Sequence, residues 1–254
     1  SKYQIAVLRE DAGRGGSKLM HRIFAEGRRV FISRPINHFP LVEDASKTLL
    51  MGGGIGITPM IAMAHRLHAI GADFALHYSM QRRADAGFLD DLAQVPWADK
   101  VNLHISDEGT RANFVALTRY APGAHIYTCG PDAYMAAVMD AAAANGFPED
   151  ARHLEYFAVP ELPDYENHPF TLILNDGREL AVAADQTASD ALNAAGVHVD
   201  VKCADGLCGV CKCGLLEGSV EHRDFVLSKA QRKTGIILCQ SRAADAGGRI
   251  RIDR

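Results

Sequence analysis

Four cysteines near the C-terminus constrain the fold of this chain more than any other feature. Cys203, Cys208 and Cys211 crowd into one short loop, KCADGLCGVCKCG, and Cys239 follows far downstream in LCQSR. The spacing C-x4-C-x2-C, then a long gap and a fourth cysteine, is the plant-type arrangement for a [2Fe–2S] cluster held by thiolates. The sequence therefore predicts these four residues as cluster ligands.

The residues between the cysteines favour the same interpretation. Gly206 and Gly209 lack a Cβ atom and tolerate unusual backbone angles, which a loop needs if its N–H groups are to point inward at a cluster. Zinc is an alternative, but structural zinc sites usually pair their ligands as two short C-x2-4-C units. Disulfides are a second alternative, which a chain without a signal peptide disfavours.

Length and composition place the chain among globular proteins and are sufficient for two compact domains. It has 254 residues, 48% of them hydrophobic, and a net charge of −4 with both signs interspersed. This charge does not suggest nucleic-acid binding. No apolar run approaches the roughly 20 residues of a membrane span, and the opening SKYQIAVLRE lacks a secretory apolar core. We expect a cytoplasmic protein that does not bind membranes.

The first 44 residues predict strands at 3–8 and 30–33 around a short amphipathic helix with Leu19, Met20 and Ile23. Gly15, Gly16 and Ser17 precede that helix and offer N–H groups and a hydroxyl to a phosphate. The alternative is a helix cap with Ser17 at the N-cap position. The segment is too short to form a closed domain, and we interpret it as the end of a larger domain.

Residues 45–157 alternate strands and helices, which predicts a parallel sheet with crossover helices. Ligands of such sheets bind beyond the carboxyl ends of the strands. Two groups of residues are expected there. The first is the glycine turn that leads into a helix, and the second is the set of residues at or just after the ends of later strands. They are Gly52, Gly53, Gly54, Gly56, Thr58, Pro59, Ser79, Asp107, Cys129, Gly130 and Pro131.

Two features of this region have two interpretations each. Cys129 is either a small apolar filler of a buried strand or a functional residue facing the cleft. Arg82 and Arg83 follow the second strand and could receive a 2′-phosphate, which would favour NADPH, or they belong to a solvated turn.

Residues 158–168 contain Pro160, Pro163 and Asn167 and predict an inter-domain linker. Residues 169–254 begin with a hairpin around Asp176-Gly177, and a helix at 189–195 precedes the cysteine loop. We expect 205–207 to form an exposed lip of that loop. Cys213 is interpreted as a packed bystander thiol, with tuning of the cluster as the alternative.

Together these stretches resemble the phthalate dioxygenase reductase family, which includes vanillate demethylase reductases. The stretches that match lie along the whole chain: GRGGS (13–17), NHFPL (37–41), GGGIGITPM (52–60), YTCGP (127–131), HLEYF (153–157), the cysteine loop and HRDFVLS (222–228). The resemblance implies an α/β plus α+β fold. It implies a C-terminal remnant of an FMN-binding β-barrel (1–44), a parallel α/β NAD-binding domain like that of ferredoxin-NADP reductase (45–157), and a β-grasp plant-type ferredoxin domain (169–254).

The resemblance also implies cofactors and roles. Electrons would pass from NADH through FMN to the cluster and then to a Rieske-type oxygenase that docks transiently on a monomeric reductase. Gly52–Gly56 would hold the pyrophosphate, and Cys129 and Thr58 would lie near the nicotinamide. Phe157 would cover the flavin side of that cleft. The residues expected around FMN are Ala6, Val7, Leu8, Gly15, Gly16, Ser17, Thr58 and Phe157. The chain departs from the family in one respect, because it has no Arg-x-Tyr-Ser element, which grips the flavin in the family.

The order of cofactors has a physical reason. NADH delivers a hydride, which carries two electrons, whereas the cluster accepts one, so a carrier able to do both must sit between them, and flavin is the usual one. The alternative hypothesis is a chain that acts only as a [2Fe–2S] electron carrier or redox-sensing module and does not oxidise NADH.

Overall fold

The computed structural model describes residues 3–13, 15–32, 34–160 and 164–254. The chain divides into two compact units, Ser1–Glu155 and Tyr156–Arg254. The predicted domain boundaries at 44/45 and 157/158 stay predictions, and each unit is described by itself. Within the described residues, no helix is both long and apolar enough to cross a membrane.

The first unit is built on a five-stranded sheet. Its strands are β1 (Lys47–Gly53), β2 (Phe74–Met80), β3 (Val101–Ile105), β4 (Ala124–Cys129) and β5 (Arg152–Glu155), in the order β3-β2-β1-β4-β5. All four neighbouring pairs are parallel, as the alternation of strands and helices predicts. The order reverses at β1, so the carboxyl end of β1 is the switch point where such sheets bind ligands.

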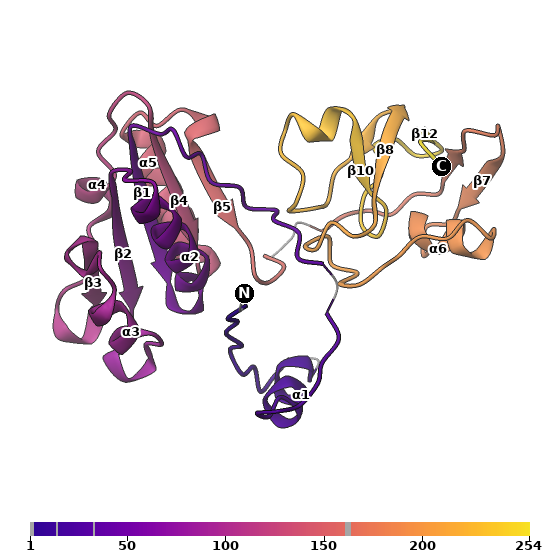
Figure 1. Ribbon diagram of the computed structural model, residues 1–254. Helices are drawn as coiled ribbons and strands as arrows, with labels where there is room; N and C mark the ends of the chain where they lie inside the picture. Colours follow the sequence, from indigo (N-terminus) through magenta and orange to yellow (C-terminus); the bar gives the residue numbers. More distant parts are fainter. Residues whose placement is uncertain (1–2, 14, 33, 161–163) are drawn as a thin grey trace. The chain divides into compact units, whose positions relative to one another are not determined.

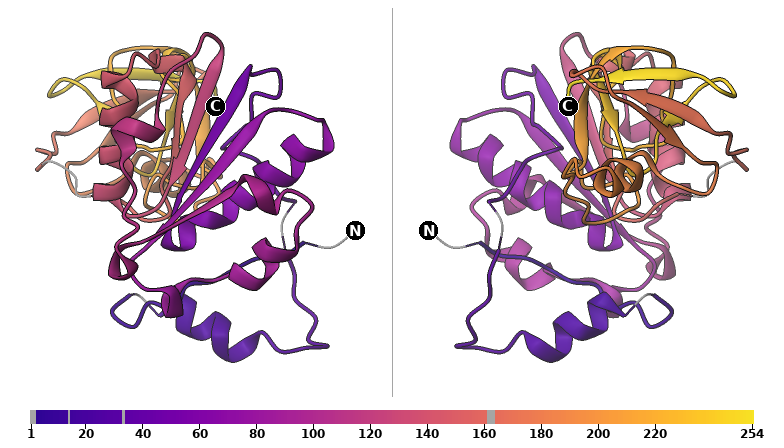
Figure 2. Two further views of the ribbon diagram at one scale, coloured as in Figure 1. Left: turned by 90° about the vertical axis from the view of Figure 1, so that its left-hand side faces the viewer. Right: turned by 90° about the vertical axis from the view of Figure 1, so that its right-hand side faces the viewer.

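Helices cover both faces of this sheet (Figures 1 and 2). On one face α2 (Ile57–Ala69) buries Met60, Met63 and Leu67 against Leu50 and Leu76. The opposite face carries α5 (Asp132–Ala144), which buries Val138 and Ala142 against other β1 and β4 residues. Two short helices, α3 (Leu89–Gln94) and α4 (Phe114–Leu117), complete the connections. The two-sided burial explains why β1 reads as an apolar run rather than an alternating one.

The N-terminal 46 residues form one helix, α1 (Gly16–Ile23), in their described part. The strands expected at 3–8 and 30–33 are not formed in the described residues, of which Ser33 is not one. A strand is stabilised by neighbouring strands, and the described part of this segment offers none. The N-cap interpretation of Ser17 is also wrong, because Gly15 is the N-cap residue. The Ser17 hydroxyl instead accepts a hydrogen bond from the Glu10 N–H at 3.0 Å.

Two histidine pairs lie on adjacent strands of the first unit. The rings of His77 and His104 stack, with Nδ1 of His77 3.0 Å from Nε2 of His104, and His125 and His153 form a similar pair at 2.9 Å. Burial, then the neighbouring histidine, lowers the pKa of both His77 and His153 to about 4. Folding therefore keeps these imidazoles neutral.

This predicts acid sensitivity of the first unit. Between pH 6.5 and 4 the unfolded chain binds protons at His77 and His153 that the folded chain does not, so stability falls as pH falls through this window. We expect a loss of about 2 kcal/mol per histidine after allowing for solvent screening. Thermal unfolding between pH 7.5 and 4.5 measures it. His77→Gln should flatten the pH dependence, whereas His68→Gln, at an exposed position of α2, should not. Equal slopes in all three proteins would contradict the assignment.

The second unit holds a five-stranded mixed sheet of order β10-β8-β12-β6-β7. Its strands are β6 (Phe170–Ile173), β7 (Glu179–Val182), β8 (Lys212–Glu217), β10 (Gly235–Ile237) and β12 (Arg249–Ile252). The predicted hairpin is present as the antiparallel pair β6–β7. Helix α6 (Ala188–Ala194) begins with a capping box between Thr187 and Asp190, and a small ladder pairs β9 (Val220–Glu221) with β11 (Arg242–Ala243). This is the mixed α/β ferredoxin architecture implied by the resemblance.

Single 3₁₀ turns link the larger elements at six places in the described chain: Gly54–Gly56, Arg83–Asp85, Ala98–Lys100, Ser106–Glu108, Glu149–Ala151 and Gln231–Lys233.

Candidate functional site

The carboxyl edge of the parallel sheet brings together residues that are far apart in sequence. Strand β1 ends at Gly53, β2 ends beside Ser79, β4 ends at Cys129 and β5 at Glu155. Cys129 is aligned with Gly52 on one side and with Glu155 on the other. The predicted cleft residues of β1, β2 and β4 therefore meet at one edge.

The turn after β1 leads directly into α2 and requires glycine for packing. A Cβ atom at Gly56 would lie 2.2 Å from the carbonyl oxygen of Cys129, a distance that no real Cβ adopts. The backbone of the turn thus packs against the end of β4. Thr58 lies in the first turn of α2 and its hydroxyl donates to the Ile55 carbonyl at 3.1 Å. Pro59 follows it and lines a separate cleft with Glu155.

Cys129 and Glu155 form a pair that the sequence did not single out. Cys129 is fully buried, and burial together with the Glu155 carboxylate raises its pKa to about 12, so it stays a neutral thiol. Burial also raises the pKa of Glu155. A partly buried carboxyl group with a raised pKa that also lines a cleft is a candidate functional group. The signal that could have found it is its position at the carboxyl end of the last strand.

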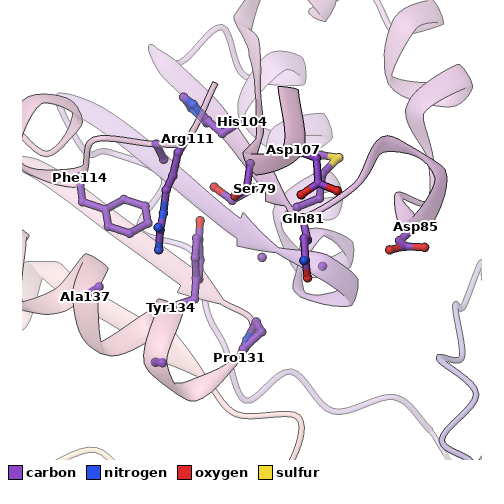
Figure 3. A pocket seen from close by; sticks show the side chains of 16 residues that line it. Ser79, Gln81, Asp85, His104, Asp107, Arg111, Phe114, Pro131, Tyr134 and Ala137 are labelled. Carbon is purple, nitrogen blue, oxygen red and sulfur yellow. The ribbon is translucent and has the colours of Figure 1, made fainter. Parts of the chain in front are cut away.

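A cleft of about 590 Å³ opens beyond the β1 and β2 ends (Figure 3). Gly53, Gly54, Ser79, Asp107 and Pro131 line it, as the sequence predicts for the nucleotide site. Gly130 precedes Pro131 and lies against Gly53. Sequence reasoning missed the other polar and aromatic lining residues: Gln81, Asp85, His104, Arg111, Phe114 and Tyr134.

The cleft contains polar groups that suit a bound nucleotide. Tyr134 extends toward Ser79 (Figure 3), and the two buried hydroxyl groups face one another. Burial raises the pKa of Tyr134 to about 12, so its phenol remains a donor. Arg111 reaches into the same space beside Phe114. Hydroxyl groups, a guanidinium and aromatic rings fit the hydroxyls, phosphates and base of a dinucleotide.

The two arginines after β2 are already engaged by carboxylates. The Arg82 guanidinium makes two bonds to Asp85, at 2.7 and 3.0 Å. Arg83 makes two to Glu108, at 2.8 and 2.7 Å. Both pairs are exposed, which matches the solvated-turn interpretation of this segment.

The residues expected around FMN are distributed over both units. In the first, the Gly15–Ser17 turn opens α1 and leaves first-turn N–H groups for an anion. Ala6 and Leu8 flank Val7, whose carbonyl lies 2.8 Å from Nε2 of His21. Phe157 belongs to the second unit and is 49% exposed. The assignment of these residues to FMN stays a prediction.

The four predicted ligand cysteines come together in the second unit as two pairs. The thiol of Cys203 contacts that of Cys208, and the thiol of Cys211 contacts that of Cys239. Within the described chain, no three His, Cys, Asp or Glu side chains gather as a site for a single ion. Two pairs suit two irons with two thiolates each, whereas a zinc ion requires four ligands at one centre. The arrangement fits a dinuclear cluster.

Backbone N–H groups of the loop face the sulfurs, as its glycines predict. The Asp205 N–H donates to the sulfur of Cys203 at 3.4 Å, and the Gly206 N–H faces Cys239. The contact between the Cys211 and Cys239 thiols lowers the pKa of Cys211 and raises that of Cys239, as expected for two neighbouring thiols that share a proton when no iron is bound. Such N–H···S contacts are one means by which a protein adjusts a cluster's reduction potential.

Two smaller predictions for this unit have different outcomes. Cys213 is a buried thiol whose sulfur lies 3.5 Å from the Asp253 carbonyl, which favours the bystander interpretation. The predicted exposed lip at 205–207 is wrong, because Gly206 is buried and both Asp205 and Leu207 are half-buried. Contacts with the 222–228 stretch account for the burial of Gly206.

The comparisons with known proteins agree with this site. The family model described as a 2Fe-2S iron-sulfur cluster binding domain matches residues 172–244. A solved phthalate dioxygenase reductase, described as a modular structure for electron transfer from pyridine nucleotides to [2Fe–2S], is 35% identical with a TM-score of 0.63, and the match covers 98% of this chain and 78% of that one. Vanillate O-demethylase oxidoreductase of Pseudomonas sp. (strain HR199 / DSM 7063) is 40% identical over 252 residues, which is 97% of this chain and 80% of the relative.

The chain belongs to the phthalate dioxygenase reductase family. It is an oxidoreductase with a [2Fe–2S] domain, and FMN and NADH are the other cofactors of this family. A phthalate dioxygenase reductase-like sequence also occurs inside larger proteins. An intact type IV self-sufficient cytochrome P450 monooxygenase matches with a TM-score of 0.89 and 36% identity, covering 98% of this chain but 33% of that protein.

Proposed function

We propose that this phthalate dioxygenase reductase relative takes a hydride from NADH and passes single electrons through its cluster to an oxygenase. The observation that carries the proposal is that one chain joins a nucleotide cleft on a parallel sheet to a loop of paired cysteines. Flavin, when bound, supplies the step from two electrons to one. The chain's own residues bind the nucleotide, hold the cluster and exclude water from the edge where β1 and β4 end.

In this proposal each residue at the sheet edge has its own role. Gly52–Gly56 and the start of α2 receive the pyrophosphate, since helix N-termini attract anions. Cys129 stays a neutral thiol beside the nicotinamide, and the Glu155 carboxyl group lies next to it on the neighbouring strand. Thr58 positions the turn through its bond to Ile55. Phe157 would cover the flavin side, and Cys203, Cys208, Cys211 and Cys239 bind the irons.

The choice of NADH follows from charge in the cleft. Asp85 and Asp107 line it, and the arginines that could have received a 2′-phosphate are paired with Asp85 and Glu108. A 2′-phosphate beside Asp107 would meet a carboxylate, whereas the 2′-hydroxyl of NADH can donate a hydrogen bond to it. We also propose that the protein is a monomer and that it works in a reducing cytoplasm. In an oxidising compartment the ligand cysteines would form disulfides and could not bind the cluster.

This assignment gives a specificity prediction. Asp107→Ser should lower the ratio of kcat/KM for NADH over NADPH by about tenfold or more, which corresponds to about 1.4 kcal/mol. Steady-state reduction of a flavin-level acceptor with each nucleotide measures the ratio. Asp99→Ser, which removes an exposed carboxylate outside the cleft, is the matched control and should leave the ratio unchanged. If the two variants show the same ratio of kcat/KM for NADH over NADPH, Asp107 does not recognise the 2′ position of the ribose.

The proposal as a whole is tested by comparing acceptors. NADH should reduce both an acceptor that draws from the flavin and an oxygenase that draws from the cluster. A Rieske-type oxygenase is the expected partner, and its contact with the reductase is expected to be small and short-lived. If NADH is oxidised with the first acceptor but no oxygenase component is ever reduced, the proposed role is wrong.

A second candidate acceptor is a haem oxygenase. The observation that favours it is the close structural similarity to part of a self-sufficient P450. Stopped-flow mixing of the reduced protein with a Rieske protein and, separately, with a ferric P450 distinguishes the two, since the physiological acceptor should be reduced faster.

A further inference from the structure

The HRDFVLS stretch at 222–228 lies directly on the cluster loop. The Phe225 N–H donates to the carbonyl of Gly206 at 3.1 Å. A Cβ atom at Gly206 would stand 3.2 Å from Cα of Asp224 and 3.3 Å from the carbonyl oxygen of Arg223, so little space separates the two segments. Gly206 is also the residue whose N–H faces the sulfur of Cys239. The carbonyl of Gly206 is thus bonded to the 222–228 stretch, while its N–H faces the ligand Cys239.

Asp224 organises the backbone that carries Phe225. Asp224 is 2% exposed, and its Oδ2 accepts hydrogen bonds from the N–H groups of Val226, at 3.2 Å, and Leu227, at 2.8 Å. Arg232 donates from Nη2 to the main-chain carbonyl of Asp224 at 2.6 Å. The Arg232 guanidinium therefore fixes the backbone just before the Phe225 N–H, and the Asp224 carboxylate fixes the backbone just after it. A buried carboxylate is expensive unless it is paired, and Nδ1 of His222 lies 3.5 Å from Oδ1 while Nη2 of Arg232 lies 3.8 Å from Oδ2.

Arg223 anchors the same stretch from the other side. It is 8% exposed, and its guanidinium donates to Glu221 and Asn167, both at 2.6 Å. It also lies over the Tyr165 ring, 4.3 Å from the centroid. The stretch is therefore fixed between the segment 165–167 and the cluster loop, which leaves it little freedom to move away from Gly206.

We propose that residues 222–228 form a clip that positions the cluster loop, with Asp224 as its positioning residue. The clip orients Gly206 so that its N–H reaches the sulfur of Cys239. Hydrogen bonds to cluster sulfurs stabilise the more negative, reduced state and so raise the reduction potential. The clip therefore sets both the lifetime of the cluster and its potential. This inference rests on the assignment of the four cysteines as ligands.

The test compares Asp224→Ala with Asp224→Asn in the full chain. Both changes remove the negative charge, but asparagine keeps an oxygen that can accept from the Val226 and Leu227 N–H groups. We expect Asp224→Ala to lose its visible cluster absorption several-fold faster under a chelator than Asp224→Asn. Its midpoint potential should be more negative than that of Asp224→Asn, and the electron paramagnetic resonance (EPR) spectrum of its reduced cluster should be altered. Glu179→Gln, which breaks an exposed ion pair to Arg249, is the control and should match the wild type.

Equal cluster lifetimes, potentials and spectra for the alanine and asparagine variants would overturn the clip. If Asp224→Ala does not fold, Arg232→Met takes its place, because it releases the Asp224 carbonyl and leaves the carboxylate bonds to Val226 and Leu227. A wild-type cluster lifetime in that variant would equally overturn the proposal. Iron analysis of the wild type separates the two hypotheses: without two irons per chain the ligand assignment fails, and with them only the clip is at stake.

Discussion

Replacing Cys208 by Ser is expected to abolish cluster assembly. Cys208 is paired with Cys203, so its loss leaves one iron with a single strong thiolate ligand, and a hydroxyl is a poor substitute. The visible charge-transfer absorption of the cluster and the bound iron should both fall to background. Reduction of a flavin-level acceptor by NADH should persist, because that step does not use the cluster.

The matched control for Cys208 is Cys213→Ser. Cys213 is a buried thiol of the same unit outside the two ligand pairs, and its sulfur lies near the Asp253 carbonyl. Its variant should retain iron and colour. Full iron content in Cys208→Ser, or equal loss in both variants, would show that the cysteine loop does not ligate the cluster as assigned.

Replacing Gly56 by Ala is expected to be the most damaging change in the first unit. The new Cβ atom would overlap the carbonyl of Cys129, so the turn after β1 must move away from the end of β4. Overpacking of this kind costs about 1–3 kcal/mol of stability. A displacement of about 1 Å at the nicotinamide would slow hydride transfer on the order of 100-fold. Thermal unfolding and single-turnover flavin reduction measure the two effects.

Gly54→Ala separates the effect of steric overlap from the effect of an unfavourable backbone conformation. Gly54 has φ +54°, and a Cβ atom there would have no neighbouring atom within 4 Å, so alanine meets backbone strain but no overlap. We expect a stability loss of about 1 kcal/mol. If Gly56→Ala is no worse than Gly54→Ala, the packing of the turn against β4 is not what holds the nucleotide site.

Elements with a strong local signal could be predicted from sequence. The Ala- and Met-rich run between Pro131 and Asn145 predicts a helix over 132–144, and α5 has these bounds. The turn at Asp176-Gly177 also predicts a second hairpin strand over 179–182, and β7 has these bounds. The cysteine spacing likewise identified the four thiols that meet in two pairs.

Features that depend on distant contacts could not be read from the sequence. The position of Glu155 at a strand end is visible in the sequence, but its raised pKa comes from burial, which the sequence does not show, next to Cys129, 26 positions earlier. Tyr134 reads as one residue of an apolar helix, yet its ring lies against Gly53. The alternating residues 3–8 predicted a strand, but alternation gives a strand only where a neighbouring strand supplies hydrogen bonds, and the described residues supply none.

Anaerobic addition of NADH to the purified protein with FMN, followed by EPR spectroscopy, tests the proposed electron path most directly. The flavin should bleach first, and the signal of a reduced [2Fe–2S] cluster should then appear. In Cys208→Ser the flavin should bleach without that signal. A wild-type protein that binds its cluster but shows no cluster signal after NADH, while dithionite elicits one, would contradict the proposed path, because electrons from the nucleotide would not reach the iron.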